Sequence, residues 1–460
     1  MSCIQAKNLL ILSVLLTGCV SAPRTVPDPA PGTPNIVFIY ADDLGFSDLG
    51  CYGHTTHKTP HLDALARGGL RFTQSYANAP NCMPSRACLM TGLYAPRHGI
   101  YTVGSSKRGR RQDRRLEPVP NRTTLDASIP TMPGILRAAG YHTALVGKWH
   151  LSDDPRQHGF DRNVGGNRFG KPPSYFSPYQ NPDLPDGPTG ESLTSRLTDE
   201  AIRFVESHRD RRFFLFLSHF AVHVPIQIEA KTEATESAQP TPEAKAAGYA
   251  AMVQSLDDSV GRMIASLDRL GLRKNTLVIF SSDNGGNGQY TSMAPLSGAK
   301  GSLLEGGLRQ PLIANWPTRI PAGRTEDTPV LGTDIFPTLA GLAQARLPVV
   351  QALDGADLMP LFTGRGKLLP RPLFWHFPVY IQATAGIQGP WRATPTTVMR
   401  LGDYKLFDHF EYRRFQLYDL RIDEAERDDL STRYPELARH LHARMLRWRH
   451  RVKAPLPAVR

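Results

Sequence analysis

Short apolar runs alternate with helical patterns along the first three quarters of the chain. The runs typical of buried strands are NIVFIY (35–40), YHTALVG (141–147), RRFFLFLS (211–218) and TLVIFSS (276–282). The longest helical pattern, Ala244 to Leu270, leads directly into the last of these runs. This alternation predicts an α/β fold with a large mixed, mostly parallel sheet sandwiched by helices.

The pattern changes after about residue 365. The segments PLFWHF, TTVMRLGDYKLFDH and FQLYDL are typical of strands joined by hairpins, and residues 435–450 read as a closing helix. We therefore predict a main domain over residues 35–365. A smaller α+β subdomain over residues 366–460 would hold a small antiparallel sheet and the closing helix.

The first residues have the features of an export signal over 1–19. Lys7 gives a positive start, a short apolar run follows, and LTGC, ending at Cys19, resembles a bacterial lipobox. A lipid on Cys19 would anchor an exported protein to a membrane, as a periplasmic or outer-membrane (cell-surface) lipoprotein of a bacterium. Cleavage after Ala22 is the alternative. The Pro-rich residues 20–34 read as an extended tether.

The chain carries an excess of positive charge. Its formal net charge of +12 favours an anionic partner or substrate, while 40% hydrophobic and 21% charged residues are ordinary for a soluble globular protein. Residues 107–122, KRGRRQDRRLEPVPNR, are densely basic. Such a run is usually a solvated loop, and the alternative is a surface that meets a polyanionic chain near a cleft. We expect no nucleic-acid partner.

Hard oxygen ligands follow two of the predicted strands. Asp42 and Asp43 come after the first run, and Asp283 and Asn284 come after TLVIFSS. In an open α/β sheet, ligands bind beyond the carboxyl ends of strands, and oxygen donors favour Ca²⁺ or Mg²⁺ over zinc. Each pair alone is more often a helix cap or a turn.

Four basic side chains also follow predicted strands, namely Lys148, His150, His223 and Lys300. In an extended chain Lys148 and His150 would point to the same side. Each one alone is more often a surface lysine or a structural histidine, so their shared placement carries the argument.

Cys82 lies in NCMPSRACLMTG, just before the helical segment Ser85 to Thr91. The N-terminus of a helix favours an anion, and Arg86 one turn later is placed to hold an oxyanion. A buried or disulfide-paired cysteine is the ordinary interpretation. Beyond the signal region the cysteines are Cys51, Cys82 and Cys88, and this odd number hints at one special thiol.

The chain resembles the type I sulfatases of the alkaline-phosphatase superfamily. Their signature is C-x-P-S-R, a small residue and a following TG, and this chain has CMPSRACLMTG. Supporting segments are NIVFIYADDLGFSDLGCYG, GYHTALVGKWH, VIFSSDNGG and LEGGLRQP. The resemblance runs from about Asn35 to the C-terminal helix.

The resemblance implies a modified cysteine and a metal ion. A formylglycine-generating maturation enzyme would convert Cys82 to Cα-formylglycine. One Ca²⁺ ion would be bound by Asp42, Asp43, Asp283 and Asn284, with the hydrated aldehyde of residue 82 facing it.

The resemblance also gives roles to the basic residues. Arg86 would steady the formylglycine, and Lys148 would contact it and the sulfate. His150 would act beside the geminal diol, while His223 and Lys300 would address the sulfate and the bridging oxygen. Many relatives have Pro before the histidine of the HxP segment, where this chain has Val222.

The predicted function is hydrolysis of sulfate monoesters, with a sulfated carbohydrate favoured over an aryl sulfate because of the basic run and the surface tether. One alternative is a phosphate or phosphonate ester hydrolase that uses the same formylglycine. The other is a non-catalytic glycan-binding lipoprotein.

Overall fold

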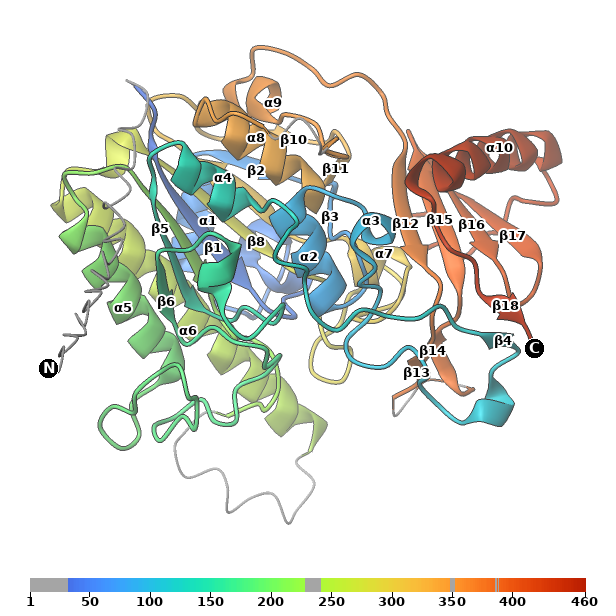
Figure 1. Ribbon diagram of the computed structural model, residues 1–460, viewed down its shortest axis with the longest axis horizontal. Helices are drawn as coiled ribbons and strands as arrows, with labels where there is room; N and C mark the ends of the chain where they lie inside the picture. Colours follow the sequence, from blue (N-terminus) through green and yellow to red (C-terminus); the bar gives the residue numbers. More distant parts are fainter. Residues whose placement is uncertain (1–31, 228–240, 348–351, 385–386, 388) are drawn as a thin grey trace, which may run out of the picture.

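The computed structural model describes residues 32–227, 241–347, 352–384, 387 and 389–460 (Figure 1). The predicted signal sequence, residues 1–19, and the tether up to residue 31 lie outside the described residues. None of the helices in the described ranges combines the length and apolar character that crossing a membrane requires.

An eight-stranded sheet forms the centre of the molecule. In spatial order its strands are β10 (Arg324–Glu326), β2 (Leu70–Phe72), β9 (Leu312–Asn315), β8 (Thr276–Ser282), β1 (Asn35–Ala41), β7 (Phe213–Ser218), β5 (His142–Gly147) and β6 (Arg162–Val164). The β1 strand pairs in parallel with both β7 and β8, and only β9 runs antiparallel to its neighbours. The predicted mixed, mostly parallel sheet is confirmed.

Helices cover both faces of this sheet because its central strands are apolar on both sides. Along β1, residues 36, 38 and 40 enter one core and residues 37, 39 and 41 enter the other. The first core is covered by α2 (Cys82–Thr91), α4 (Met132–Ala138), α8 (Ile335–Leu342) and α9 (Met359–Thr363). The second is covered by α1 (Pro60–Arg67), α5 (Leu193–Ser207) and α6 (Pro242–Arg269).

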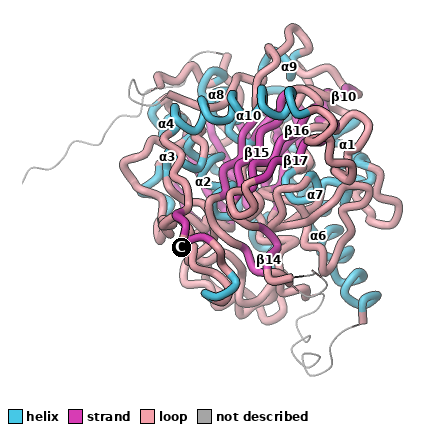
Figure 2. The backbone as a smooth tube through the Cα atoms, turned by 90° about the vertical axis from the view of Figure 1, so that its right-hand side faces the viewer, coloured by secondary structure: helices cyan, strands magenta, loops and turns pink. Residues whose placement is uncertain are grey.

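A second, antiparallel sheet builds the C-terminal subdomain. Its strands, in spatial order, are β12 (Leu373–Phe377), β15 (Thr396–Leu401), β16 (Tyr404–His409) and β17 (Arg414–Asp419). The closing helix α10 (Pro435–Val452) packs on these strands, which Figure 2 views from their own side of the molecule. The predicted subdomain architecture is therefore confirmed. The predicted boundary at residue 365 falls between α9 and β12.

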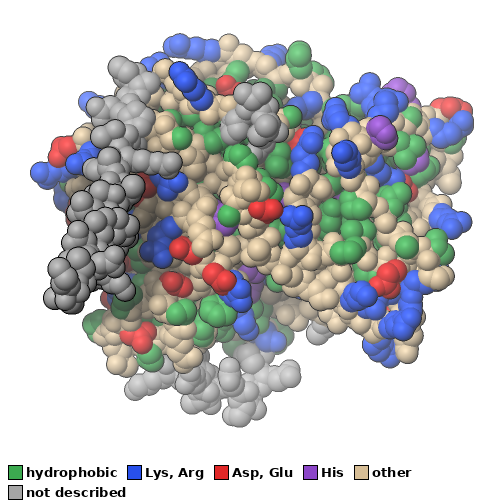
Figure 3. Space-filling view, viewed as in Figure 1, with side chains coloured by type: hydrophobic (Ala, Val, Ile, Leu, Met, Phe, Trp, Pro, Cys, Tyr) green, Lys and Arg blue, Asp and Glu red, His purple; other side chains and the backbone are tan. Residues whose placement is uncertain are grey.

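Short elements complete the described fold. They are β3 (Ser75–Tyr76) paired with β11 (Val330–Leu331), β13 (Ile381–Gln382) paired with β14 (Trp391–Ala393), β4 (Leu116–Glu117) paired with β18 (Ala458–Val459), and the helices α3 (Ala95–His98) and α7 (Glu305–Leu308). Through β4 and β18, the basic segment 107–122 lies against the end of the chain. Figure 3 shows Lys and Arg side chains mixed with acidic ones at this corner, at the lower right.

A buried cluster of charges joins the subdomain to the main domain. The Lys405 ammonium lies 2.9 Å from a carboxylate oxygen of Glu305 and 2.9 Å from one of Glu426. Arg309 and the Tyr76 hydroxyl hold the second oxygen of Glu305. Burial raises the pKa of Glu426 to about 7, Lys405 opposes this rise, and the neighbouring Glu305 adds to it.

Candidate active site

The acidic pairs after β1 and β8 lie next to each other. These strands are parallel neighbours, and Ala41 is in register with Ser282. Asp43 and the Asp283–Asn284 pair are therefore in contact. The Asp43 amide donates to Asp283 Oδ1 at 3.2 Å, and Asn284 Nδ2 donates to Asp43 Oδ1 at 2.8 Å. All four predicted metal ligands are fully buried at the carboxyl edge of the sheet.

Cys82 is the first residue of α2, which begins three residues before the predicted helical segment. Its sulfur lies 4.0 Å from Asp43 Oδ1, and its side chain is only 2% exposed. Cys51, Cys82 and Cys88 are all free thiols, so no disulfide joins Cys82 to another cysteine of the described residues. The thiol lies inside the protein beside the acidic cluster.

Arg86 lies one turn further along α2, as its spacing predicts. Its Nε donates to Asp283 Oδ2 at 2.8 Å, and its Nη1 donates to Ser218 Oγ at 2.7 Å. Its Nη2 is buried without a hydrogen-bond acceptor among the described residues, and it lies 4.0 Å from Asp42 Oδ1. Arg86 is thus bound to the acidic cluster and keeps one N–H group available.

Both predicted lysines reach the same cluster. Lys148 Nζ donates to Asp42 Oδ2 at 2.5 Å, and Lys300 Nζ donates to Asp43 Oδ2 at 2.6 Å. Lys148 is fully buried, so it is not the surface lysine that a lone residue would suggest. Burial alone would lower the pKa of Lys300, but the negative groups around it, Asp43 foremost, together raise it, so the ammonium stays charged.

The two predicted histidines follow the carboxyl ends of the parallel neighbours β5 and β7 and line the same cavity as Cys82. His223 Nε2 lies 3.6 Å from Asp43 Oδ2. The backbone at His150 is left-handed, with φ of 67°, so the condition of an extended chain, under which Lys148 and His150 would share a side, is not met. Its imidazole packs on Gly170, where a built Cβ would lie 2.4 Å from the His150 Cε1 atom.

The environment keeps His150 uncharged. Burial, together with the positive charges of Lys148 and Arg86, lowers the pKa of His150 well below its usual value. The imidazole is therefore neutral at neutral pH and free to accept a proton. Its Nδ1 has no hydrogen-bond partner among the described residues.

A cavity of about 340 Å³ opens over Cys82. Besides Cys82, His150, His223 and Lys300, its lining includes three cations that sequence reasoning missed, namely Arg108, Lys171 and Arg392. Arg108 belongs to the basic segment, which gave a regional signal without singling it out. No local pattern marks Arg392, which comes from β14 of the subdomain.

The acidic cluster suits a divalent cation. Ligand atoms of Asp42, Asp43, Cys82 and His223 lie within 4.8 Å of one another. Asp42 Oδ1 and Asn284 Oδ1 are buried without a hydrogen-bond donor among the described residues, which is costly unless another partner binds them. Carboxylate and amide oxygens are ligands of Ca²⁺ and Mg²⁺.

The charges of the side chains show how a bound divalent cation would change the site. When all three carboxyl groups are ionised, Asp42, Asp43 and Asp283 balance the charges of Arg86, Lys148 and Lys300. Burial raises the pKa of Asp42 well above its usual value. A bound divalent ion would leave the site positive and able to receive an anion.

Comparisons with known proteins agree with this site. Residues 34–345 match the family model described as Sulfatase, and residues 299–451 match the model described as N-sulphoglucosamine sulphohydrolase, C-terminal. N-acetylgalactosamine-6-sulfatase of Mus musculus is 33% identical over 82% of this chain and 73% of its own length. Arylsulfatase A of Homo sapiens is 37% identical over 77% of this chain and 72% of its own length.

A solved structure extends the likeness to the whole fold. Ps i-CgsB in complex with k-i-k-neocarrahexaose superposes with a TM-score of 0.74 and 28% identity, over 90% of this chain and 92% of that one. The family model covers the strands that carry the acidic pairs and the helix that begins at Cys82. The chain therefore belongs to the sulfatase family, enzymes that hydrolyse sulfuric esters.

Proposed function

We propose that this sulfatase removes sulfate from a sulfated carbohydrate, with Cys82 converted to formylglycine and one Ca²⁺ ion bound by Asp42, Asp43, Asp283 and Asn284. One observation carries the proposal. Residue 82 begins α2 directly beside a buried acidic cluster, and the cavity above it is lined by histidines and cations. A formylglycine-generating maturation enzyme is the partner that this modification requires.

The two groups would divide the chemistry. Bound Ca²⁺ would neutralise ester oxygens and lower the pKa of a coordinated hydroxyl group. The hydrated aldehyde offers two hydroxyls on one carbon, so one oxygen can take the sulfuryl group and deprotonation of the other can release sulfate and restore the aldehyde.

The protein's own residues supply charge and proton transfer. Lys148 and Lys300 offset the negative charge of the ester, which otherwise repels a nucleophile. His223 or Lys300 gives a proton to the leaving sugar oxygen. The neutral His150 removes the proton of the second hydroxyl, a task for which its lowered pKa keeps it unprotonated.

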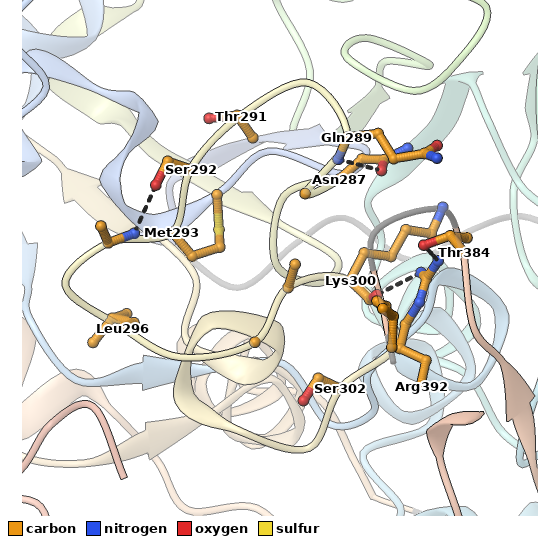
Figure 4. Close-up of a pocket in the computed structure, with 15 residues that line it drawn as sticks. Asn287, Gln289, Thr291, Ser292, Met293, Leu296, Lys300, Ser302, Thr384 and Arg392 are labelled. Carbon is orange, nitrogen blue, oxygen red and sulfur yellow. Dashed lines mark hydrogen bonds between the residues drawn. The ribbon is translucent and has the colours of Figure 1, made fainter. Parts of the chain in front are cut away.

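The carbohydrate preference rests on the cavity that adjoins this site. Figure 4 shows this hollow, of about 560 Å³, whose lining carries the amides of Asn287 and Gln289 and several hydroxyl groups. Amides and hydroxyls suit the many hydroxyl groups of a sugar. Lys300 lines both cavities, so a chain bound here would continue from the reacting ester. The structural relative Ps i-CgsB was solved with an oligosaccharide bound.

The test is a desulfation screen on protein whose residue 82 has been identified by mass spectrometry. Defined sulfated oligosaccharides, an aryl sulfate, and phosphate and phosphonate esters are compared on one preparation. We expect formylglycine at residue 82 and the highest kcat/KM on a sulfated oligosaccharide, with loss of turnover in Cys82→Ala. A profile dominated by phosphate or phosphonate esters, or full activity with an unmodified thiol, would overturn the proposal.

We also propose that the chain is exported and lipidated at Cys19, because of the lipobox-like LTGC. Palmitate labelling of the full chain and of Cys19→Ala tests this. Equal labelling of both would reject lipidation at this residue.

A further inference from the structure

Three cations line the cavity over Cys82 or its rim in addition to those bound to the acidic cluster. Arg86, Lys148 and Lys300 are bound to carboxylates of the acidic cluster. Arg108, Lys171 and Arg392 also line this cavity or its rim. In the described part of the chain, no carboxylate oxygen lies within 4.0 Å of the nitrogens of these last three residues.

Arg392 is held in a fixed position between the two cavities. Its Nη1 donates to the Lys300 carbonyl oxygen at 2.6 Å, and its Nη2 donates to Thr384 Oγ1 at 2.6 Å (Figure 4). Its Nε is buried and has no acceptor among the described residues. The side chain crosses Gly301, where a built Cβ would lie 2.5 Å from Arg392 Cδ. The guanidinium is thus preorganised and still has a free donor.

Arg108 is brought to the same cavity by packing of its neighbour. The Gly109 backbone lies on the Trp391 ring, where a built Cβ would be 2.3 Å from Cη2. Trp391 Nε1 donates to the Asp113 carbonyl oxygen at 3.2 Å. Arg108 itself donates to the Val103 carbonyl oxygen. The basic segment and β14 therefore hold Arg108 and Arg392 in one fixed arrangement.

Placing these two guanidinium groups together costs free energy. Burial lowers the pKa of Arg392, Asp43 opposes this, and the positive charge of Arg108 lowers it further. Two half-buried like charges repel each other unless an anion lies between them. The scissile sulfate monoester carries a single negative charge, and the groups beside Cys82 already address it.

We propose that Arg108 and Arg392 bind a second anionic group of the substrate, a carboxylate or a second sulfate ester, with Lys171 at the rim of the same subsite. The inference rests on the proposed function, because it concerns the sugar that carries the reacting sulfate. The enzyme is then specific for sugars with two neighbouring negative charges. The planar guanidinium groups of the two arginines can each donate a pair of parallel hydrogen bonds to the oxygens of a carboxylate or sulfate.

Three disaccharides that carry the same reacting sulfate test the subsite. The partner sugar is neutral in the first, a uronic acid in the second and sulfated in the third. Each is assayed with the natural chain, Arg392→Gln, Arg108→Gln and the control Arg111→Gln, which removes an exposed charge from the same segment. The readout is the ratio of kcat/KM for each dianionic substrate to that for the monoanionic one.

The natural chain should prefer at least one dianionic substrate by about tenfold or more, the scale of one charge-assisted hydrogen bond. Arg392→Gln and Arg108→Gln should each remove about tenfold of this ratio, mainly through KM, and Arg111→Gln should leave it unchanged. A response to the uronic acid alone identifies a carboxylate site, and a response to the disulfated sugar alone identifies a sulfate site. A natural ratio near one, or a ratio insensitive to both variants, refutes the proposal.

Binding separates this inference from the proposed function. Calorimetry on Cys82→Ala with the same three disaccharides measures the preference without turnover. Tighter binding of a dianionic sugar that is lost in Cys82→Ala/Arg392→Gln supports the subsite even if no sulfate is released. Equal affinities for all three sugars refute it. Arg392→Lys keeps the positive charge but loses the planar guanidinium that can donate two parallel hydrogen bonds. It should therefore retain only part of the preference for dianionic sugars.

Discussion

Replacing Gly170 by alanine tests whether His150 acts from a fixed position. The built Cβ would lie 2.4 Å from Cε1, 2.5 Å from Nε2 and 2.9 Å from Nδ1 of the His150 ring, against ordinary contacts of 3.4–4 Å. The backbone at Gly170 is not left-handed, so alanine brings no backbone strain. The ring must therefore retreat by about 1 Å, a misplacement that costs on the order of 100-fold in rate, or about 2.7 kcal/mol.

The assay compares kcat/KM for a sulfated oligosaccharide between the natural chain and Gly170→Ala. Gly341→Ala is the matched control, because Gly341 lies in α8 and a Cβ added there makes only an ordinary contact of 3.9 Å, with Asp357. We expect the melting temperatures of all three proteins to agree within a few degrees. Activity of Gly170→Ala within about threefold of the natural chain would show that the reaction does not depend on the position of His150.

Three further perturbations follow from charges and burial. Lys405→Met leaves Glu305 and Glu426 buried side by side without their shared cation. It should lower the free energy of unfolding, measured in urea, by on the order of 3 kcal/mol, and a decrease below about 1 kcal/mol would contradict this. Burial lowers the pKa of His376 from 6.5 to about 3, because the folded protein favours the neutral imidazole. The contribution of His376 to the free energy of unfolding is therefore fully present above pH 6.5 and is lost as the pH falls below it. The natural chain should lose unfolding free energy between about pH 7 and pH 5.5, and His376→Gln should reduce this loss by about 1 kcal/mol. His440 is exposed, so the control His440→Gln should leave the loss unchanged. Removal of divalent ions with EGTA should lower activity and melting temperature, and Ca²⁺ should restore both; unchanged melting of verified metal-free protein argues against the ion site.

The acidic cluster was predictable because it follows from strand order alone. Asp42, Asp43, Asp283 and Asn284 end two apolar runs, and the carboxyl ends of parallel strands meet at one edge of the sheet. The position of Cys82 at a helix start followed in the same way from local pattern, although α2 begins at Cys82 itself. Its nearly complete burial did not follow, because it depends on the helices packed around α2.

The subsite for a second anion lay beyond sequence reasoning for a physical reason. Arg108 and Arg392 are far apart along the chain, and their meeting depends on Gly109 packing against Trp391 and on the Lys300 carbonyl. Neither contact has a periodic or positional signal. The left-handed backbone of His150 was missed likewise, because nothing local to that residue requires it.

The burial of α2 sets an order of events in the making of this enzyme. All ten of its residues are buried, and the Cys82 side chain is 2% exposed. The maturation enzyme proposed to oxidise this thiol needs close access to it, and the burial of α2 hinders that access once the chain has folded. Under the proposed conversion of Cys82 to formylglycine, oxidation would have to precede folding, and the two processes would compete for each new molecule. A chain that collapses first would keep its thiol and stay inactive, so rapid overproduction should yield folded protein with a reduced active fraction.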